Sequence, residues 1–494
     1  MAPFRRIATC LVLAACWPAL GFSQEATNPP ALDAVPAEGA ADDSLAALKT
    51  QADQAYRKGD YASTIALADQ VLAKSREDHA ALYLRASARV EQGYHQRDAK
   101  LIRLGIADTR EAIRIEGKGK ADYYLPYLYG MTNLAILEHK PSHAATARSI
   151  ADQVLNRTSY SNGERANIIY QRGLANIQTR DFEAARGDFN EAIRLKSDHL
   201  AAHVALCNIT NETKGPEEAL AVFTRAVASL PGNPLLLNNR AMHFHAMGRN
   251  KEALVDFAAA LKADPQYLPA LINRAFVQMQ TGNTDAAMDD LTAALAIDRN
   301  STQALAMRGT LLVQLARASE AIADYQRVCD LEPTSGMAAA DLGFAYFFSE
   351  NYGDALAEFN KALTLNPEIP FLTPWRFAAA IRVKKDLTND PAVKAALAKV
   401  ADQRNWFDWL TAYEAGRVTD AELLGAANPK DEVARKAQLC EAYYFIGLEM
   451  LRRKKPDDAR AFFAQAVETE AERLSAFRGA RFALQGIEED TAAK

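Results

Sequence analysis

The stretch NPLLLNNRAMHFHAMGRNKEALVDFAAALKADPQ, residues 233–266, determines the fold of this chain. Its two halves have the apolar spacing of amphipathic helices, and Gly248 lies between them where a turn is expected. Pro265 follows the second half, at a position where proline ends a helix. The stretch therefore predicts two helices joined by a tight turn.

The same pattern recurs along the chain with a period of 34 residues. One column holds alanine, the residue four positions later is mostly aromatic, and the residue three positions beyond it is mostly alanine. The columns are Ala185, Ala219, Ala253, Ala287, Ala321 and Ala355; Phe189, Phe223, Phe257, Leu291, Tyr325 and Phe359; and Ala192, Ala226, Ala260, Ala294, Val328 and Ala362. Three columns that keep their register through six copies indicate a repeat architecture.

The unit at 233–266, with Gly248, Ala253, Phe257 and Ala260, resembles the tetratricopeptide repeat superfamily. This resemblance implies an all-α fold, a right-handed TPR superhelix (α-solenoid) of about ten helix–turn–helix hairpins. Small residues where the two helices cross allow their backbones to approach, and the aromatic residue fills the space beside them. No hairpin buries its apolar face alone, so neighbouring hairpins are expected to stack.

The period also divides the chain into segments. Divergent hairpins are expected at 45–165, with a degenerate copy at 121–157, and six regular repeats at 166–369. Residues 370–439 are expected to form a divergent helical pair and a connector. The last segment, 440–494, is expected to hold one more repeat and a capping helix near 474–486.

Residues 1–23 have the features of a secretory signal peptide, with Arg5 and Arg6 before an apolar run too short to span a bilayer. Cleavage after Ser23 would give a soluble periplasmic protein. Alternatively, LAAC at 13–16 resembles a bacterial lipobox, which would leave Cys16 lipidated and the protein anchored to a membrane. Both interpretations predict export. The following residues, 24–44, are rich in Pro, Ala and acids and are expected to form a flexible linker.

The C-terminal part carries a narrower resemblance. WFDWLTAYEAG, residues 406–416, and LCEAYYFIGLEMLRRKKPDDARAFFAQAVET, residues 439–469, resemble NlpI-like exported bacterial TPR proteins. Members of that group are adaptors that bring peptidoglycan hydrolases and a periplasmic protease together. The resemblance implies a non-catalytic adaptor of the cell envelope that has protein partners.

Arginine and aspartate occupy matched columns of the repeats. The arginine is in the first helix of a hairpin, and the aspartate directly precedes the aromatic column of the second helix in the regular repeats. The pairs are Arg85 and Asp108, Arg172 and Asp188, Arg240 and Asp256, Arg274 and Asp290, and Arg308 and Asp324. A guanidinium forked onto a carboxylate satisfies both groups, so each pair predicts a salt bridge that fixes hairpin register. Leu342 with Glu358 is the one mixed case, and this acid can point to solvent.

The concave groove implied by the family is lined by regularly spaced residues of each first helix. The predicted partner-binding residues are Asn208, Asn211, Asn238, Asn239, Met242, His245, Asn273, Phe276, Thr310 and Phe344, and Tyr170 and Phe347 occupy similar positions. The Lys/Asn/Arg clamp that some members use for a terminal carboxylate is absent. Asn239 and Asn273 resemble the asparagine ladder with which other members bind an extended peptide backbone.

Composition and motifs exclude other functions. The net charge is −5 and no basic stripe is present, which argues against nucleic acid as a partner. No zinc-binding spacing or nucleophile motif occurs, and no segment outside the repeats is long enough for a catalytic domain, so no metal, cofactor or enzyme activity is expected. Cys207, Cys329 and Cys440 are too scattered for a disulfide framework, and Cys207 is expected to be a packed core residue.

These observations favour a non-catalytic scaffold that binds extended segments or domains of other proteins. An alternative is a helper in the export or assembly of an envelope polysaccharide. Glycan binding would require exposed aromatic platforms, whereas peptide binding would require amides and small pockets. Trp375, Trp406 and Trp409 are expected to be buried, which favours peptide binding.

Overall fold

The structure is a computed structural model that describes residues 40–117, 119–157, 160–472 and 474–492. Within these ranges every regular element is helical and no strand occurs. The predicted signal peptide and Cys16 lie outside the described residues, as does most of the predicted linker. The first described helix, α2 (Ala40–Arg57), already begins inside that linker segment.

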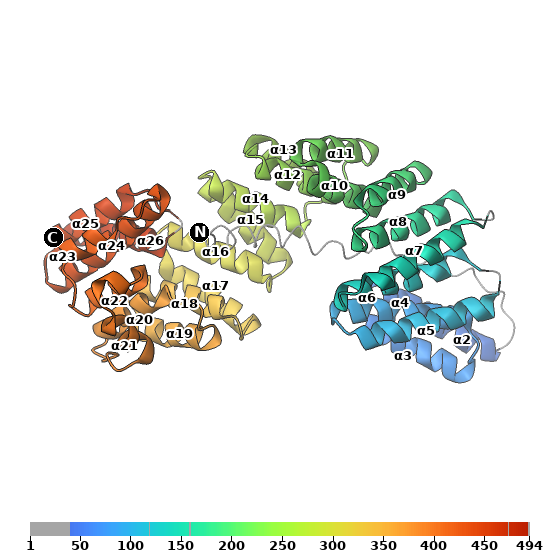
Figure 1. Cartoon of the computed structure of the whole chain (residues 1–494), viewed down its shortest axis with the longest axis horizontal. Helices are drawn as coiled ribbons and strands as arrows, with labels where there is room; N and C mark the ends of the chain where they lie inside the picture. Colours follow the sequence, from blue (N-terminus) through green and yellow to red (C-terminus); the bar gives the residue numbers. More distant parts are fainter. Residues whose placement is uncertain (1–39, 118, 158–159, 473, 493–494) are drawn as a thin grey trace. The chain divides into compact units, whose positions relative to one another are not determined.

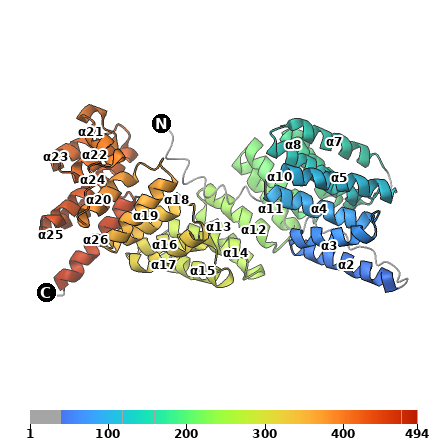
Figure 2. The same ribbon diagram turned by 90° about the horizontal axis from the view of Figure 1, so that it is seen from below.

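The helices form two compact units, Met1–Asp264 and Pro265–Lys494, called unit 1 and unit 2 below. In both units consecutive helices pack against one another as antiparallel hairpins, and the hairpins stack along the chain (Figures 1 and 2). The chain is therefore an all-α TPR solenoid within each unit.

Unit 1 consists of six hairpins. A short 3-10 turn, η2 (Ala121–Tyr124), precedes the third of them. The hairpins pair α2 with α3 (Tyr61–Lys74), α4 (His79–His95) with α5 (Ala99–Glu116), α6 (Leu125–Leu137) with α7 (Pro141–Leu155), α8 (Asn162–Gln178) with α9 (Phe182–Leu195), α10 (Leu200–Lys214) with α11 (Pro216–Ser229), and α12 (Pro234–Ala246) with α13 (Asn250–Ala263). The first helices α2, α4, α6 and α8 also contact one another in sequence.

Unit 2 begins with three regular hairpins. They pair α14 (Leu268–Gln280) with α15 (Thr284–Ile297), α16 (Thr302–Gln314) with α17 (Ala318–Leu331), and α18 (Gly336–Phe348) with α19 (Tyr352–Leu365). The segment expected to hold one helical pair and a connector instead contains α20 (Leu372–Arg382), α21 (Pro391–Ala398), η3 (Ala401–Gln403), α22 (Trp406–Glu414) and α23 (Asp420–Ala426). Prolines and asparagine or threonine caps divide this segment into short helices.

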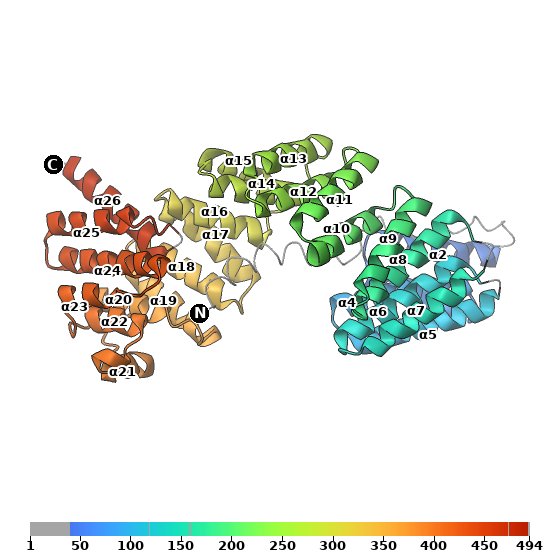
Figure 3. The ribbon, with the colours of Figure 1, turned by 45° about the horizontal axis from the view of Figure 1, so that its top comes forward.

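The last hairpin pairs α24 (Glu432–Arg452) with α25 (Pro456–Glu468) and starts within the predicted connector. The C-terminal helix α26 (Ser475–Ala492) contacts α18, α24 and α25, and its end extends beyond the other helices of unit 2 (Figures 2 and 3). A ring contact between Phe348 and Phe482 joins α18 to α26.

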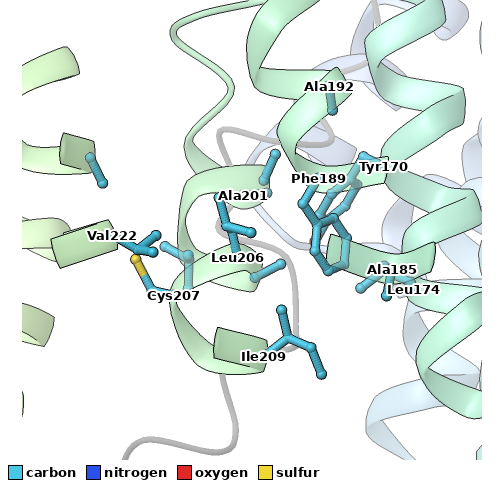
Figure 4. Close-up of a cluster of buried hydrophobic side chains, with 14 of the residues drawn as sticks. Tyr170, Leu174, Ala185, Phe189, Ala192, Ala201, Leu206, Cys207, Ile209 and Val222 are labelled. Atoms are coloured by element: carbon cyan, nitrogen blue, oxygen red, sulfur yellow. The ribbon is translucent and has the colours of Figure 1, made fainter. Parts of the chain in front are cut away.

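The three sequence columns form the core of the hairpins, and all their members are buried. Gly173 shows how closely the two helices of a hairpin approach, because a Cβ atom there would lie 2.5 Å from Cε1 of Phe189. Figure 4 shows the Phe189 and Tyr170 rings side by side in this core, with Cys207 beside Val222. Close-packed small and aromatic residues thus set the spacing of the hairpin.

Candidate functional site

The structure brings the five arginine–aspartate pairs together, each between the two helices of one hairpin. In the hairpin α14–α15, Arg274 donates from Nε to Asp290 Oδ2 at 2.8 Å and from Nη2 to Oδ1 at 2.6 Å. The other four pairs have the same forked contact. Because the five aspartates are only 5% to 8% exposed, these ion pairs lie at the core and hold helices rather than ligands.

Two of the arginines also reach the preceding hairpin. Nη1 of Arg172 donates to Asp152 of α7 at 2.7 Å, and Nη1 of Arg85 donates to Asp69 of α3 at 2.6 Å. The repeat columns did not predict these contacts, because Asp69 and Asp152 are in the neighbouring hairpin and belong to no recurring column. Ion pairs therefore connect consecutive hairpins in this part of unit 1.

A sixth arginine continues the column in unit 2. Arg376 of α20 lies 34 residues after Leu342, is 7% exposed, and forms an ion pair with Asp390 at the start of α21. The period alone would have found Arg376, but its partner column holds Ala392 and the acid is two residues earlier. The Glu358 side chain, which interrupts the pattern of pairs, is 20% exposed, and its Oε2 is buried 3.6 Å from Lys361 Nζ.

On α10 and α12 of unit 1, several predicted partner-binding residues are accessible. Asn211 is exposed, and Asn208, Asn239 and His245 are half-buried. His245 Nδ1 lies 2.7 Å from Oδ1 of Asn250, so the ring is held in place.

The remaining two predicted residues of α12 are buried. The side chain of Asn238 is 5% exposed, and its Nδ2 donates to Oδ1 of Asn239 at 3.2 Å. Met242 is 7% exposed and belongs to the core. Asn238 therefore orients Asn239, the amide that solvent reaches.

In unit 2, Asn273, Phe276 and Thr310 are half-buried. The Thr310 hydroxyl donates to the carbonyl of Ala306 at 2.9 Å and lies 3.1 Å from the Tyr325 hydroxyl. Asn239 belongs to unit 1 and Asn273 to unit 2, so the asparagine ladder remains a prediction.

Three aromatic residues predicted near the groove belong to the core instead. Phe344 is 8% exposed and its ring contacts those of Phe348, Phe359 and Trp375. Phe347 and Tyr170 are buried as well. The assignment of Phe344 to the binding surface is therefore wrong, because neighbouring aromatic residues of α19 and α20 cover this side of α18.

The burial prediction for tryptophan holds only for Trp375, which is 2% exposed. Trp406 and Trp409, both on the short helix α22, are half-buried. Trp406 Nε1 donates to Oε2 of Glu441 at 2.6 Å, and the Arg404 guanidinium lies 5.1 Å from the centre of the Trp409 ring. Both side chains are thus engaged within the chain.

His199 and Cys207 are structural side chains. His199 accepts a hydrogen bond from the backbone of Ala202 at the start of α10, and burial lowers its pKa to about 4. Cys207 is fully buried without a disulfide, and burial raises the pKa of its thiol. A neutral buried thiol is a poor nucleophile. In the described part of the chain, no group of three or more histidine, cysteine or acidic side chains could hold a metal ion.

Among the described helices, none combines the length and apolar character that crossing a membrane requires.

Comparison with protein families matches four segments to models described as tetratricopeptide repeat. They are residues 49–111, 170–234, 244–311 and 306–370. The chain belongs to the tetratricopeptide repeat superfamily. Proteins of this superfamily are generally non-catalytic, and the repeats of this TPR chain suggest a protein-binding scaffold. Comparison with curated proteins finds no match, and the narrower NlpI-like resemblance stays a prediction.

Solved TPR structures are similar to parts of the chain. YrrB, "a TPR protein with an unusual peptide-binding site", is 21% identical with a TM-score of 0.32, over 40% of this chain and 97% of that one. Pseudomonas aeruginosa pilF is 20% identical with a TM-score of 0.37, over 42% and 94%. A tetratricopeptide repeat protein from Parabacteroides merdae is 17% identical with a TM-score of 0.33, over 65% and 98%. At these TM-scores the similarities carry no argument about function.

Proposed function

We propose that this chain is a non-catalytic scaffold of the bacterial cell envelope that binds extended segments or domains of other proteins, such as envelope hydrolases or proteases. The observation that supports it best is the set of accessible polar side chains on α10 and α12, namely Asn208, Asn211, Asn239 and His245. An amide offers one acceptor and two donor hydrogens, which suits a peptide backbone without demanding a particular sequence.

The surroundings of Asn239 favour binding because part of this site is already ordered. Its Oδ1 is held by Asn238, which is itself buried. A side chain that is fixed before binding loses less conformational entropy when a partner arrives.

Affinity capture from a cell-envelope extract, followed by mass spectrometry, tests this proposal. The full chain is compared with a variant carrying Asn208→Ala, Asn211→Ala and Asn239→Ala. Asn190→Ala is the matched control, because Asn190 is an exposed amide on the second helix of a hairpin. We expect the same proteins with the unchanged chain and the control, and their loss with the triple variant. Recovery of no protein partner with the unchanged chain contradicts the scaffold.

The envelope location rests on the N-terminal pattern of Arg5, Arg6 and the apolar run, and on the two cleavage interpretations. Fractionation of bacteria that produce the full chain or Cys16→Ser separates these alternatives. Membrane-bound parent and soluble variant indicate a lipoprotein, whereas both in the periplasm indicate ordinary cleavage. Retention of both in the cytoplasm contradicts export.

The polysaccharide helper remains the second candidate because Trp406 and Trp409 are half-buried rather than buried. Indole rings at a surface supply the platforms on which sugar rings stack. Capture of glycan by the full chain, and its loss with Trp409→Ala, favours this alternative. Capture of protein that is unaffected by Trp409→Ala favours the scaffold.

A further inference from the structure

Three turns of unit 2 concentrate exposed positive charge. They lie where α20, α22 and α24 end and cover residues 382–386, 415–418 and 452–455. Together they are called the basic edge below. Its exposed basic residues are Lys384, Lys385, Arg417, Arg452, Arg453, Lys454 and Lys455, and its single exposed acid is Asp386.

The three turns lie at the same edge of unit 2. The helices α20, α22 and α24 are neighbours, and they run parallel because the chain reverses direction twice between one and the next (Figures 1 and 3). Nη1 of Arg382, the last residue of α20, lies 3.8 Å from Oε2 of Glu414, the last residue of α22. Trp406 at the start of α22 donates to Glu441 of α24. Eight residues further along both helices, Glu414 and Glu449 therefore lie at the same level.

Much of this charge has no partner within the hairpins. Arg452 and Arg453 both form ion pairs with Glu449, and Lys455 Nζ lies 3.5 Å from Asp458. The other four basic residues form no salt bridge within the described part of the chain, namely Lys384, Lys385, Arg417 and Lys454. Because they follow the last residue of their helices, they add little to the stabilisation of a helix dipole, which falls off beyond the last turn.

The regular hairpins of unit 2 show that the fold does not require this charge. The turn after α14 is Thr-Gly-Asn at 281–283, and the turn after α18 carries the acid Glu350. The turn after α16 has one arginine, Arg317, which forms an ion pair with Glu320. The backbone is nevertheless the same, because Glu350, with a φ of 60°, has the left-handed conformation of Lys384 and Lys454. Basic residues at these turns are therefore not explained by the turn geometry.

The opposite edge of the same hairpins has the opposite charge. It consists of the connections at 366–371, 399–405, 427–431 and 469–472, where Lys430 is the single exposed basic residue. The exposed acids of these connections are Glu368, Asp402, Asp431, Glu470 and Glu472. The two edges therefore attract ligands of different charge, although the net charge of the chain is −5.

The spacing of the basic edge suits an extended acidic peptide. Packed helices lie about 8–10 Å apart, so three neighbouring turns span roughly 20 Å. An extended chain advances about 3.3 Å per residue, so acids three residues apart can each reach one turn. Lysine and arginine at these turns offer charged donors to carboxylates.

Two observations favour a peptide over a lipid bilayer. The basic edge contains no tryptophan, tyrosine or phenylalanine, the residues that anchor a protein at a membrane interface. Asp386 lies within the edge, and the exposed Asp457 and Asp458 directly follow it. A flat anionic surface would meet these acids as well, whereas a single chain can pass between them.

We propose that the basic edge binds an extended acidic segment of a partner protein. The proposal rests on the scaffold function and adds a second binding surface to it. The accessible amides Asn208 and Asn211 belong to unit 1, whereas the basic edge belongs to unit 2. Two separate surfaces allow one chain to hold two partners, or two segments of one partner, at the same time.

Titration of the full chain with a short peptide tests the proposal. The probe is Glu-Ser-Gly-Glu-Ser-Gly-Glu with blocked ends, and its control has glutamine in place of each glutamate. Binding is followed by NMR of the peptide. We expect the glutamate peptide alone to bind, and its affinity to fall as salt is raised from about 0.02 M to about 0.5 M. Equal binding of the two peptides, or binding of neither, overturns the proposal.

A charge-reversal variant locates the site. Lys384→Glu, Arg417→Glu and Lys454→Glu together change one exposed residue in each turn and should weaken binding at least about tenfold. The matched control is Arg299→Glu, Lys430→Glu and Arg435→Glu, which changes exposed residues elsewhere in unit 2 and alters the net charge equally. Circular dichroism should show both variants folded. Equal weakening by the two variants overturns the site, because net charge alone would then explain binding.

Other occupants of the edge give different results. If phosphatidylglycerol vesicles bind the parent but not the edge variant, while the peptide binds both, the edge takes lipid and the proposal is wrong. If sedimentation shows association of the parent that the edge variant loses, and the peptide does not compete with it, the occupant is a second copy of this chain. If envelope proteins bind the edge variant as well as the parent, the edge is wrong and the scaffold stands. If the parent captures no partner, the scaffold itself fails.

Discussion

Arg172 in unit 1 and Arg274 in unit 2 occupy the same repeat position but have different partners. Arg274 forms its ion pair with Asp290 within the hairpin α14–α15. Arg172 binds Asp188 within α8–α9 and also Asp152 of the preceding hairpin, and Asn176 donates to the same Asp188 at 2.9 Å. One arginine therefore supports a single hairpin, whereas the other connects two.

This difference shows how charge can change the coupling between repeats. In a solenoid, each hairpin interacts with its neighbours, and the interface energy determines whether hairpins unfold singly or together. Around α7–α9 the interface contains an ion pair in addition to apolar packing. We therefore expect more cooperative opening there than at α14–α15.

Removing the central aspartates should have the largest effect. Asp188→Ala leaves Arg172 and Asn176 without their buried acceptor and should cost about 4 kcal/mol of local stability. Asp290→Ala should cost about 3 kcal/mol, because it leaves only the Arg274 guanidinium without its acceptor. Hydrogen exchange with mass spectrometry would compare protection of α7–α9 and α14–α15. Loss of protection confined to α8–α9 in the first variant would contradict coupling to α7.

Stability of the two units should respond differently to pH, because unit 1 contains Glu91 on α4, a buried acid with no salt bridge among the described residues. Its pKa is about 8 in the folded chain, raised from an ordinary value of 4.5, so between these values only the folded chain holds the proton. Stability of α4–α6 should therefore fall as pH rises from 5 to 8, by on the order of 3 kcal/mol. Glu91→Gln should remove most of this dependence in hydrogen exchange corrected for intrinsic rates. If the stability of α4–α6 depends on pH in the same way in Glu91→Gln, Glu91 does not cause that dependence.

The helix crossings should also differ in their tolerance of a methyl group. Gly173→Ala would place Cβ 2.5 Å from the Phe189 ring and should cost about 2 kcal/mol. The equivalent position of α14–α15 holds Ala275 opposite Leu291, so Ala275→Gly should cost only about 0.7 kcal/mol through helix propensity. Hydrogen exchange of α8–α9 and α14–α15 at increasing denaturant concentration measures the stability lost in each variant. Equal losses would mean that the Phe189 ring moves aside.

Removing the link between hairpins should have a smaller effect. Asp152→Ala deletes an ion pair whose acid is 54% exposed, so about 0.5 kcal/mol is expected. Asp289→Ala, an exposed acid of α15, is the control and should be neutral. A double-mutant cycle with Arg172→Met would isolate the coupling. Additive losses of stability in the double variant would show that the Arg172–Asp152 ion pair contributes no coupling energy.

The smallest change in stability is expected from a substitution in the turn between α16 and α17. Ala316 has a φ of 57°, in the left-handed region where Gly282 serves the turn of the preceding hairpin, α14–α15. Ala316→Gly should stabilise the turn of α16–α17 by about 0.5 kcal/mol, because it relieves the steric cost of Cβ. Gly282→Ala should have the opposite sign. Thermal unfolding of both variants measures this, and a loss of stability in Ala316→Gly would contradict the turn argument.

The residues that were predicted well interact within one repeat. Asp290 is 16 residues from Arg274, and both recur with the same period, so their pairing could be inferred from columns. Phe344 was misassigned because its burial depends on Trp375, a residue of the next, irregular helix. Glu91 was not singled out for a related reason, since its environment is made by Tyr61 and Tyr129 from other hairpins.

The sequence by itself determined the family, the hairpin period and the ion pairs inside each hairpin. These depend on spacings along one amphipathic helix pair, which local packing repeats from copy to copy. Only the tertiary structure decided the contacts of Arg172 with Asp152, the core position of Phe344 and the tyrosine surroundings of Glu91. The physical reason is that the crossing of neighbouring hairpins selects which side chains meet, and no periodic column encodes that choice.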